Sequence, residues 1–222
     1  MTSSTAAADP GGDRTRDAER TREELLTVAT RVFAEEGYAG ARVDEIAART
    51  STTKRMIYYY FGGKEGLYLA VLERAYTRVR SLEAQLDVDG LDPAEAIRRL
   101  AELTFDHHET HQDFVRLVSI ENIHHAEHLR RSPILPGLAA PALDVLTRIL
   151  ERGRADGVFR DDVDALDVHM VISSFCIFRE ANRHTFAAIF DRDLLDPAHR
   201  PRLRRLLGDM VVAHLTARPG GE

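Results

Sequence analysis

The spacing of apolar residues along most of the chain is the feature that most constrains its fold. From Thr21 onward, apolar positions recur at three- and four-residue intervals, and glycines or prolines separate the runs. No segment shows the sustained alternation of apolar and polar residues that a half-buried strand needs, and no repeat recurs with a fixed period. The sequence therefore predicts an all-α fold.

The first helix is predicted to start at Thr21, which has capping-box spacing with Glu24, and to end at Gly37. Two short helices follow, beginning at Val43 and at the Thr52–Thr53 pair. Longer helices are predicted over residues 64–86, 93–111, 114–131, 141–156, 164–190 and 202–217.

The chain is predicted to form two domains between two tails. Residues 1–16 are rich in small and polar residues, which is typical of a disordered tail, and residues 218–222 form a second tail. A small helical domain is predicted over residues 17–64, and a larger one over residues 65–217.

Charge and cysteine content exclude several classes of protein. The single Cys176 cannot form an intrachain disulfide, and no apolar run reaches the ~18 residues of a membrane span. We therefore expect a soluble cytoplasmic protein.

The net charge is −6, but residues 1–64 carry ten basic and ten acidic side chains, so the acid excess lies wholly in residues 65–222. The segment from Ile46 to Lys64 contains four cations and no carboxylate, a local pattern that favours a polyanionic partner.

Two short helices joined by a tight turn, after a longer helix, are the plan of a helix-turn-helix DNA reader. We expect Ile46, Ala47, Ile57 and Phe61 to pack against the first helix. That packing leaves the cations and phenols of the second short helix for base edges and phosphates, namely Lys54, Arg55, Tyr58, Tyr59 and Tyr60. The alternative for Tyr58 is packing within the domain, and for the cations it is a solvated face.

Lys64 follows Gly62 and Gly63 at the start of a helix, where free backbone N–H groups favour a phosphate. A nucleotide-binding P-loop is excluded, because no glycine precedes the Gly-Lys pair at the required spacing. In addition, Glu65 stands where Ser or Thr should hold magnesium.

Residues 21–80 resemble the DNA-binding domain of TetR-family transcriptional regulators. The resemblance is carried by the segments 43–47 and 53–67. It implies a helix-turn-helix domain followed by a divergent helical domain that binds a small effector and forms a homodimer, most often in a repressor. The implied partners are a double-stranded, palindromic DNA operator and the effector, with no membrane and no cofactor.

The same resemblance implies individual DNA contacts. Four residues match contacts of the recognition helix: Lys54, Arg55, Tyr59 and Tyr60. Two match contacts to the DNA backbone, Tyr58 and Lys64, and Thr53 matches the usual helix cap.

Two residues depart from the pattern of the family. Arg42 stands where Thr or Ser usually caps the second helix, although its side chain can still reach a phosphate. Ser51 stands where Gly often makes the turn, which predicts a small cost from a left-handed serine. The arginines of the N-terminal tail either enter the minor groove or remain disordered.

Histidines in the second domain suggest a metal-binding alternative. His107 and His111 are four residues apart, as are His124 and His128, so each pair would share a helix face. The four could bind one zinc or nickel ion as a metal sensor or a metal-dependent enzyme. Surface or pocket histidines are the other interpretation, and we predict no metal. Because no catalytic arrangement or cofactor fingerprint is found, we also predict that the chain is not an enzyme.

The segment 175–186 combines aromatic side chains with arginines, as a small-molecule pocket does. It resembles, more weakly, TetR members that control catabolism of aromatic or nitrogen-heterocyclic acids. The candidate effector residues are His124, His128, Phe175, Phe178, Arg179, Asn182 and Arg183. The alternative use of this helix is the dimer interface. By position in the family, the last two long helices, residues 164–190 and 202–217, would form the homodimer, and Cys176 is predicted to be a small buried residue.

Overall fold

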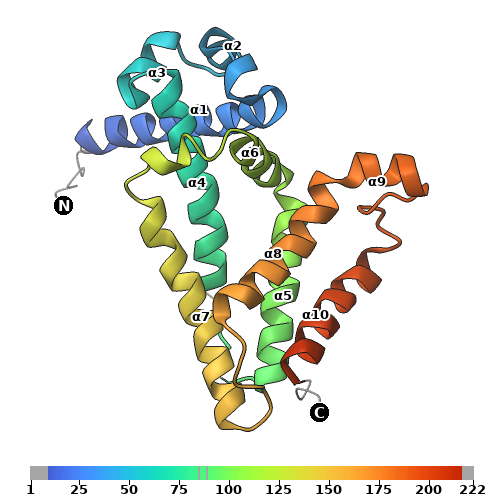
Figure 1. Cartoon of the computed structure of the whole chain (residues 1–222). Helices are drawn as coiled ribbons and strands as arrows, with labels where there is room; N and C mark the ends of the chain where they lie inside the picture. The colour runs from blue at the N-terminus through green and yellow to red at the C-terminus, as the bar shows by residue number, and fades with distance from the viewer. Residues whose placement is uncertain (1–9, 85, 89, 217–222) are drawn as a thin grey trace, which may run out of the picture. The chain divides into compact units, whose positions relative to one another are not determined.

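The structure is a computed structural model that describes residues 10–84, 86–88 and 90–216. It divides into two compact units, with the boundary between Leu72 and Glu73. We call them the N-terminal and C-terminal units. All regular elements of the described residues are helices, which confirms the predicted all-α class (Figure 1). No described helix combines the length and apolar character that crossing a bilayer requires.

The N-terminal unit contains α1 (Pro10–Gly40), α2 (Val43–Ala48), α3 (Lys54–Phe61) and the first turns of α4 (Lys64–Ala84). Its core contains fully buried Phe33, Ile46, Ile57 and Tyr68. The rings of Phe33 and Tyr68 meet edge to face at 4.8 Å. Because the start of α4 belongs to this core, the unit extends beyond the domain boundary predicted at residue 64.

The start of the first helix differs from the sequence prediction. α1 begins at Pro10, so residues 10–16 of the predicted tail are helical, while residues 1–9 lie outside the described residues. Thr21 does not cap this helix; its hydroxyl donates to the Asp17 carbonyl at 2.8 Å. The helix is interrupted at Gly37, where φ is 70° and ψ is 175°. The predicted break at this glycine is confirmed, although the chain continues in helical conformation to Gly40.

Over the residues that the structure describes, the C-terminal unit contains the rest of α4 and seven further helices. They are α5 (Pro93–Thr110), α6 (Gln112–Ile123), the short 3-10 helix η1 (Leu129–Arg131), α7 (Leu135–Ala155), α8 (Ala165–Ala181), α9 (Arg183–Phe190) and α10 (Arg200–Thr216). Figure 1 shows α10 alongside α5, and α5, α7, α8 and α10 share one apolar core. Asp92 and Asp164 cap α5 and α8 by accepting backbone N–H groups at 2.9 and 2.6 Å. Cys176 is buried in this core, as predicted.

Three predicted helix boundaries are wrong in the C-terminal unit. The helix predicted over 114–131 ends at Ile123, because His125 and Ala126 adopt left-handed backbone conformations that no helix accommodates. The helix predicted over 164–190 is split at Asn182 into α8 and α9. α7 begins at Leu135 rather than at residue 141. The spacing of apolar residues does not encode these breaks and starts. The predicted tail 218–222 lies outside the described residues.

Gly153 in α7 allows the helix to approach Phe159 closely. A Cβ atom at this position would lie 1.9 Å from Cδ2 of Phe159, whose ring is buried in the core. We predict that Gly153→Ala lowers the free energy of unfolding by about 1–3 kcal/mol, because the buried ring has no room to retreat.

Gly137 in the same helix is the matched control, because an added Cβ meets no atom within 4 Å. Gly137→Ala should leave the protein as stable or more stable, by up to about 1 kcal/mol. Chemical denaturation followed by circular dichroism measures both variants. If Gly153→Ala and Gly137→Ala are equally stable, the ring of Phe159 does not require a glycine at position 153.

Candidate nucleic-acid interface

Helices α2 and α3, with the turn of residues 49–53 between them, form a helix-turn-helix braced by α1. Ile46 on α2 and Ile57 on α3 have no exposed surface, which fixes the inner face of both helices. Burying each such side chain stabilises the arrangement by roughly 1.5–3 kcal/mol. Phe61, which was expected in this core, is only half-buried, and the Arg22 guanidinium lies 5.3 Å from the centre of its ring. The predicted helix-turn-helix architecture is confirmed.

The Glu24 carboxylate on α1 holds the turn between α2 and α3. Its Oε1 accepts the Ser51 backbone N–H at 2.8 Å, and its Oε2 accepts the Ser51 hydroxyl at 2.7 Å. These bonds lower the pKa of Glu24. The sequence assigned Glu24 to a capping box instead, because helical spacing alone cannot show a contact between residues 24 and 51.

Ser51 does not adopt the left-handed conformation expected of it. Among described residues other than glycine, positive φ occurs only at His125, Ala126 and Asp191. The predicted strain of a left-handed serine is therefore wrong. A serine is useful here for another reason, since its hydroxyl supplies the second hydrogen bond to Glu24.

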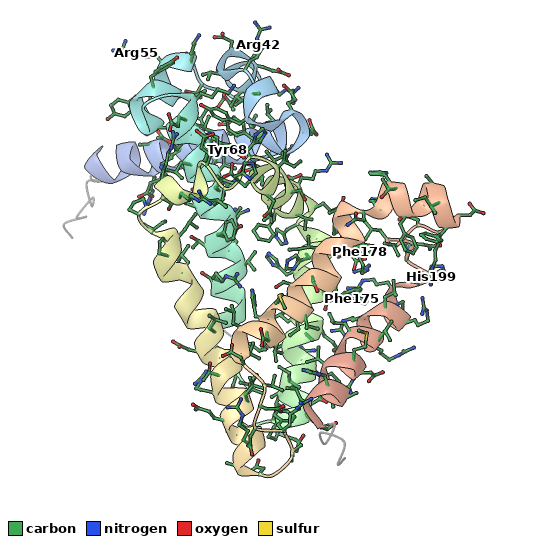
Figure 2. The ribbon with its side chains drawn as sticks, in the orientation of Figure 1. Arg42, Arg55, Tyr68, Phe175, Phe178 and His199 are labelled. Atoms are coloured by element: carbon green, nitrogen blue, oxygen red, sulfur yellow. The ribbon has the colours of Figure 1, made fainter. Side chains whose placement is uncertain are left out.

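The outer face of α3 carries exposed phenols and cations. Tyr59 is 76% exposed and Tyr58 52% exposed, whereas Tyr60 is half-buried with its ring 5.1 Å from that of Tyr59. Arg42 and Arg55 are exposed as well, and Figure 2 shows them at the outer edge of this unit, directed away from Tyr68 in its core. The alternative in which Tyr58 packs inside the domain does not fit this exposure.

The two cations of α3 differ in their surroundings. The Lys54 ammonium lies 2.9 Å from the Asp44 carboxylate of α2, and this hydrogen-bonded pair raises the pKa of Lys54. Arg55 forms no ion pair with any described residue. A phosphate or base edge that binds Lys54 must compete with the Asp44 carboxylate for its ammonium group. At Arg55 there is no such competition from a paired carboxylate.

The two helix starts lack side-chain caps. Thr53 occupies the N-cap position of α3, as predicted, but its hydroxyl makes no capping hydrogen bond. Arg42 holds the corresponding place before α2 and also forms none. Both side chains are exposed, and neither provides an acceptor for the first backbone N–H groups of its helix. An anion is the natural ligand of such groups.

Lys64 lies at the start of α4 and turns toward the end of α1. Its Nζ lies 4.8 Å above the Tyr38 ring and 3.4 Å from the Ala39 carbonyl oxygen. The chain reaches this position through Gly62, whose φ of 73° ends α3. Gly66 is required as well, because a Cβ there would lie 1.9 Å from the Phe61 carbonyl oxygen. The sequence did not indicate Tyr38, which holds the ammonium by a cation–π contact.

The histidines proposed as metal ligands are distributed over different elements. His107 and His111 stack at the end of α5 with ring centres 4.1 Å apart. Burial, together with the neighbouring His111 and other cations, lowers the pKa of His107 to about 4. His128 instead pairs with the buried Glu121 at 3.1 Å. Among the described side chains, no three His, Cys, Asp or Glu residues are arranged to hold a metal ion.

The residues predicted to bind an effector come from two parts of the C-terminal unit. His124 and His128 belong to the turn after α6, whereas the other five lie on α8 or at the start of α9. Arg179 is buried, with its guanidinium 3.8 Å from the centre of the Phe105 ring, and it donates to the Leu194 carbonyl. Arg183 pairs with Asp193 at 2.9 Å. Figure 2 marks Phe175 and Phe178 on α8, of which Phe178 is exposed.

Two protein-family models match the chain. The model for bacterial regulatory proteins of the tetR family matches residues 25–71, which include the helix-turn-helix and the start of α4. The model for the tetracyclin repressor-like C-terminal domain matches residues 93–211, more than half of the chain. The chain belongs to the TetR family. Members of this family are transcriptional regulators that bind DNA, which agrees with the prediction that the chain is not an enzyme.

Individual transcriptional regulators resemble the chain over most of its length. The HTH-type transcriptional repressor NicS of Pseudomonas putida is 37% identical over 204 residues, which cover 92% of this chain and 96% of NicS. Among solved structures, the putative transcriptional regulator SCO4942 from Streptomyces coelicolor has a TM-score of 0.65 at 30% identity, covering 86% of this chain and 97% of that one. A TetR-family regulator from Marinobacter aquaeolei has a TM-score of 0.70 at 18% identity, covering 92% of this chain and all of the other, and supports the fold alone.

Glu24 provides a test of how the TetR helix-turn-helix is held. We predict that Glu24→Gln lowers the melting temperature of the N-terminal unit and weakens DNA binding, because the turn loses its carboxylate acceptor. Since the folded-state pKa of Glu24 is below its ordinary value of 4.5, the stabilisation is present above pH 4.5 and is lost as the pH falls through the lower value.

Glu36→Gln is the control, because Glu36 is an exposed glutamate of the same helix. Melting curves between pH 3 and pH 7 compare the two variants, and the Glu24→Gln curve should depend less on pH than the unsubstituted protein does. Identical behaviour of the two variants would argue against the role of Glu24.

Proposed function

We propose that this TetR-family protein is a repressor that binds a palindromic operator as a homodimer and is released by a small aromatic or carboxylate effector. It would act in the cytoplasm, where its operator lies. The observation that carries the proposal is the division of α3 into a buried face at Ile57 and an outer face with Tyr58, Tyr59 and Arg55. The name of NicS, a transcriptional repressor, supports repression rather than activation.

The proposed DNA contacts are of two kinds. Arg55 and Tyr59 lie on the exposed face of a helix that would enter the major groove, where a guanidinium recognises guanine edges and a ring contacts thymine methyl groups. The remaining candidates would mainly position the helix against the sugar–phosphate backbone. They are Arg42, Thr53, Lys54, Tyr58, Tyr60 and Lys64. Backbone contacts add affinity that depends on salt, whereas base contacts provide sequence selectivity.

We predict that Arg55→Gln and Tyr59→Ala each weaken binding to the operator by about tenfold or more, since each removes a contact to the bases. A mobility-shift assay with DNA flanking the protein's own gene measures this loss. The matched control is Arg78→Gln, at an exposed arginine of α4 in the C-terminal unit. The proposal fails if the unsubstituted protein binds that DNA no better than an unrelated duplex.

An exposed apolar stripe supports the proposed homodimer. On α8, Leu166, Met170 and Phe178 follow one another at multiples of four residues and are all exposed. Leu206 and Met210 on α10 are exposed in the same spacing. Residues four apart form one ridge of a helix, and such ridges pack into the grooves of a second helix. Exposed apolar side chains gathered on one face of a helix are typical of an interface.

We predict that Met170→Asp converts the dimer into monomers, because it places a charge in the apolar stripe of an interface. Operator binding should be lost with it, since a single reading helix covers too few base pairs. Ile123→Asp is the control, because Ile123 on α6 is 71% exposed, compared with 59% for Met170. Sedimentation velocity measures the mass. A monomeric unsubstituted protein, or a dimer that survives Met170→Asp, would refute the proposed interface.

A further inference from the structure

An ion pair joins the beginnings of the two short helices of the helix-turn-helix. Asp44 is the second residue of α2, and Lys54 is the first residue of α3. The Lys54 Nζ lies 2.9 Å from Oδ1 of Asp44 and 3.1 Å from its Oδ2. We propose that Asp44 is a specificity-determining residue of DNA binding, because it opposes contacts of Lys54 with phosphates and leaves the ammonium group to a guanine edge.

This inference rests on the proposed function, since it concerns the helix that would enter the major groove. It goes beyond that function by moving Lys54 from the residues that position the helix to those that read bases. It also gives a role to Asp44, an acid on a surface that would face a polyanion.

Lys54 has both the position and the chemistry of a base contact. Residues at the N-terminal end of a recognition helix are the ones that meet base edges, and Lys54 and Arg55 are the first two residues of α3. The Lys54 side chain is exposed. A lysine ammonium donates to O6 and N7 of guanine, which are acceptors in the major groove.

The competition between Asp44 and DNA for this ammonium group is unequal for phosphates and for bases. An ammonium group has three N–H donors, and the two oxygens of Asp44 engage at most two of them. A neutral guanine edge can accept the remaining donor while the ion pair persists. A phosphate that approaches Lys54 also approaches the Asp44 carboxylate, and the two anions repel each other. The pair therefore disfavours phosphate contacts and spares a base contact.

The exposure of Asp44 makes this repulsion effective. Its side chain is 74% exposed, so a phosphate near Lys54 meets the carboxylate without intervening protein. The next acid of α2 has a different partner, because Glu45 pairs with Arg49 at the end of the same helix. Arg55 forms no ion pair with any described residue, so it binds phosphates and bases without such a bias.

A purely structural role of Asp44 is the alternative. An acid in the first turn of a helix is stabilised by the free backbone N–H groups and the helix dipole. In that case, removing the carboxylate loosens α2 and weakens binding to every duplex. The proposed role predicts the opposite for DNA that lacks the operator sequence, because its binding depends on phosphate contacts and should become tighter.

Fluorescence anisotropy measures binding of the full chain to two duplexes over a range of salt concentrations. One is the operator fragment found by mobility shift in the DNA flanking the gene, and the other is a scrambled duplex of equal length and composition. We expect Asp44→Asn to bind the scrambled duplex about fivefold more tightly and the operator less than twofold more tightly. The salt dependence for the scrambled duplex should steepen by roughly one released counterion.

Glu36→Gln is the charge-matched control, because it removes one negative charge from an exposed position of α1. It should change the ratio of the two affinities less than twofold, because solvent and salt screen its charge. Asp44→Ser is the second variant if Asp44→Asn folds poorly. An unchanged ratio in the Asp44 variants overturns the proposal, and so does a ratio that falls only because operator binding weakens.

The dependence on Lys54 is tested in a double variant. When Lys54→Ala is already present, adding Asp44→Asn should change both affinities alike, because an unpaired carboxylate repels the phosphates of either duplex equally. A loss of discrimination that persists without the lysine shows that Asp44 does not act through Lys54, and it overturns the proposal.

The guanine assignment is tested by exchanging each G·C pair of the operator for A·T. At one position in each half-site, the exchange should weaken binding of the unsubstituted protein roughly tenfold but that of Lys54→Ala less than twofold, since adenine presents an N6 donor in place of the O6 acceptor. If no position shows this dependence, the guanine contact is refuted. A selective protein whose selectivity is independent of Asp44 refutes this inference alone, whereas equal binding of the unsubstituted protein to both duplexes refutes the proposed function with it.

Discussion

The hydrogen-bonded contact between Glu24 and Ser51 is the constraint on which the DNA-reading geometry depends. Apolar packing buries Ile46 and Ile57, but apolar contacts are not directional and do not by themselves fix the angle between two helices of six and eight residues. The carboxylate of α1 binds both the backbone and the hydroxyl of the turn, so it fixes where α3 begins. The outward direction of Arg55 and Tyr59 follows from that position.

A similar device operates in the C-terminal unit. Glu121 is a buried carboxylate that accepts backbone N–H groups from the turn after α6, where His125 and Ala126 hold left-handed conformations. Such conformations cost about 1–2 kcal/mol per residue and persist only when surrounding contacts enforce them. The turn leads directly into η1, whose Leu129 and Arg130 line a cavity beside α4 and the start of α7. The left-handed backbone, the buried acid and part of the cavity wall are therefore consecutive in the chain.

Much of the helix-turn-helix was predictable, because it depends on local sequence. The spacing of Val43, Ile46 and Ile57 predicts two short helices, and the cations and tyrosines that follow Thr53 predict the chemistry of the second. The partner of Lys54 was not predictable, since Asp44 approaches it only when the two helices fold against each other. The surroundings of Arg179 were not predictable either. Its guanidinium lies over the ring of Phe105, a residue of another helix.

The sequence by itself determined the helical class, the helix-turn-helix and the polar character of α3, because apolar periodicity, breakers and side-chain chemistry are properties of neighbouring residues. Tertiary structure alone decided which acids hold the turns, where the long predicted helices break, and what surrounds Arg179. The reason is physical. Those features arise from contacts between residues far apart in the chain, such as Glu24 with Ser51 and Arg179 with Phe105, whose separation no periodicity records.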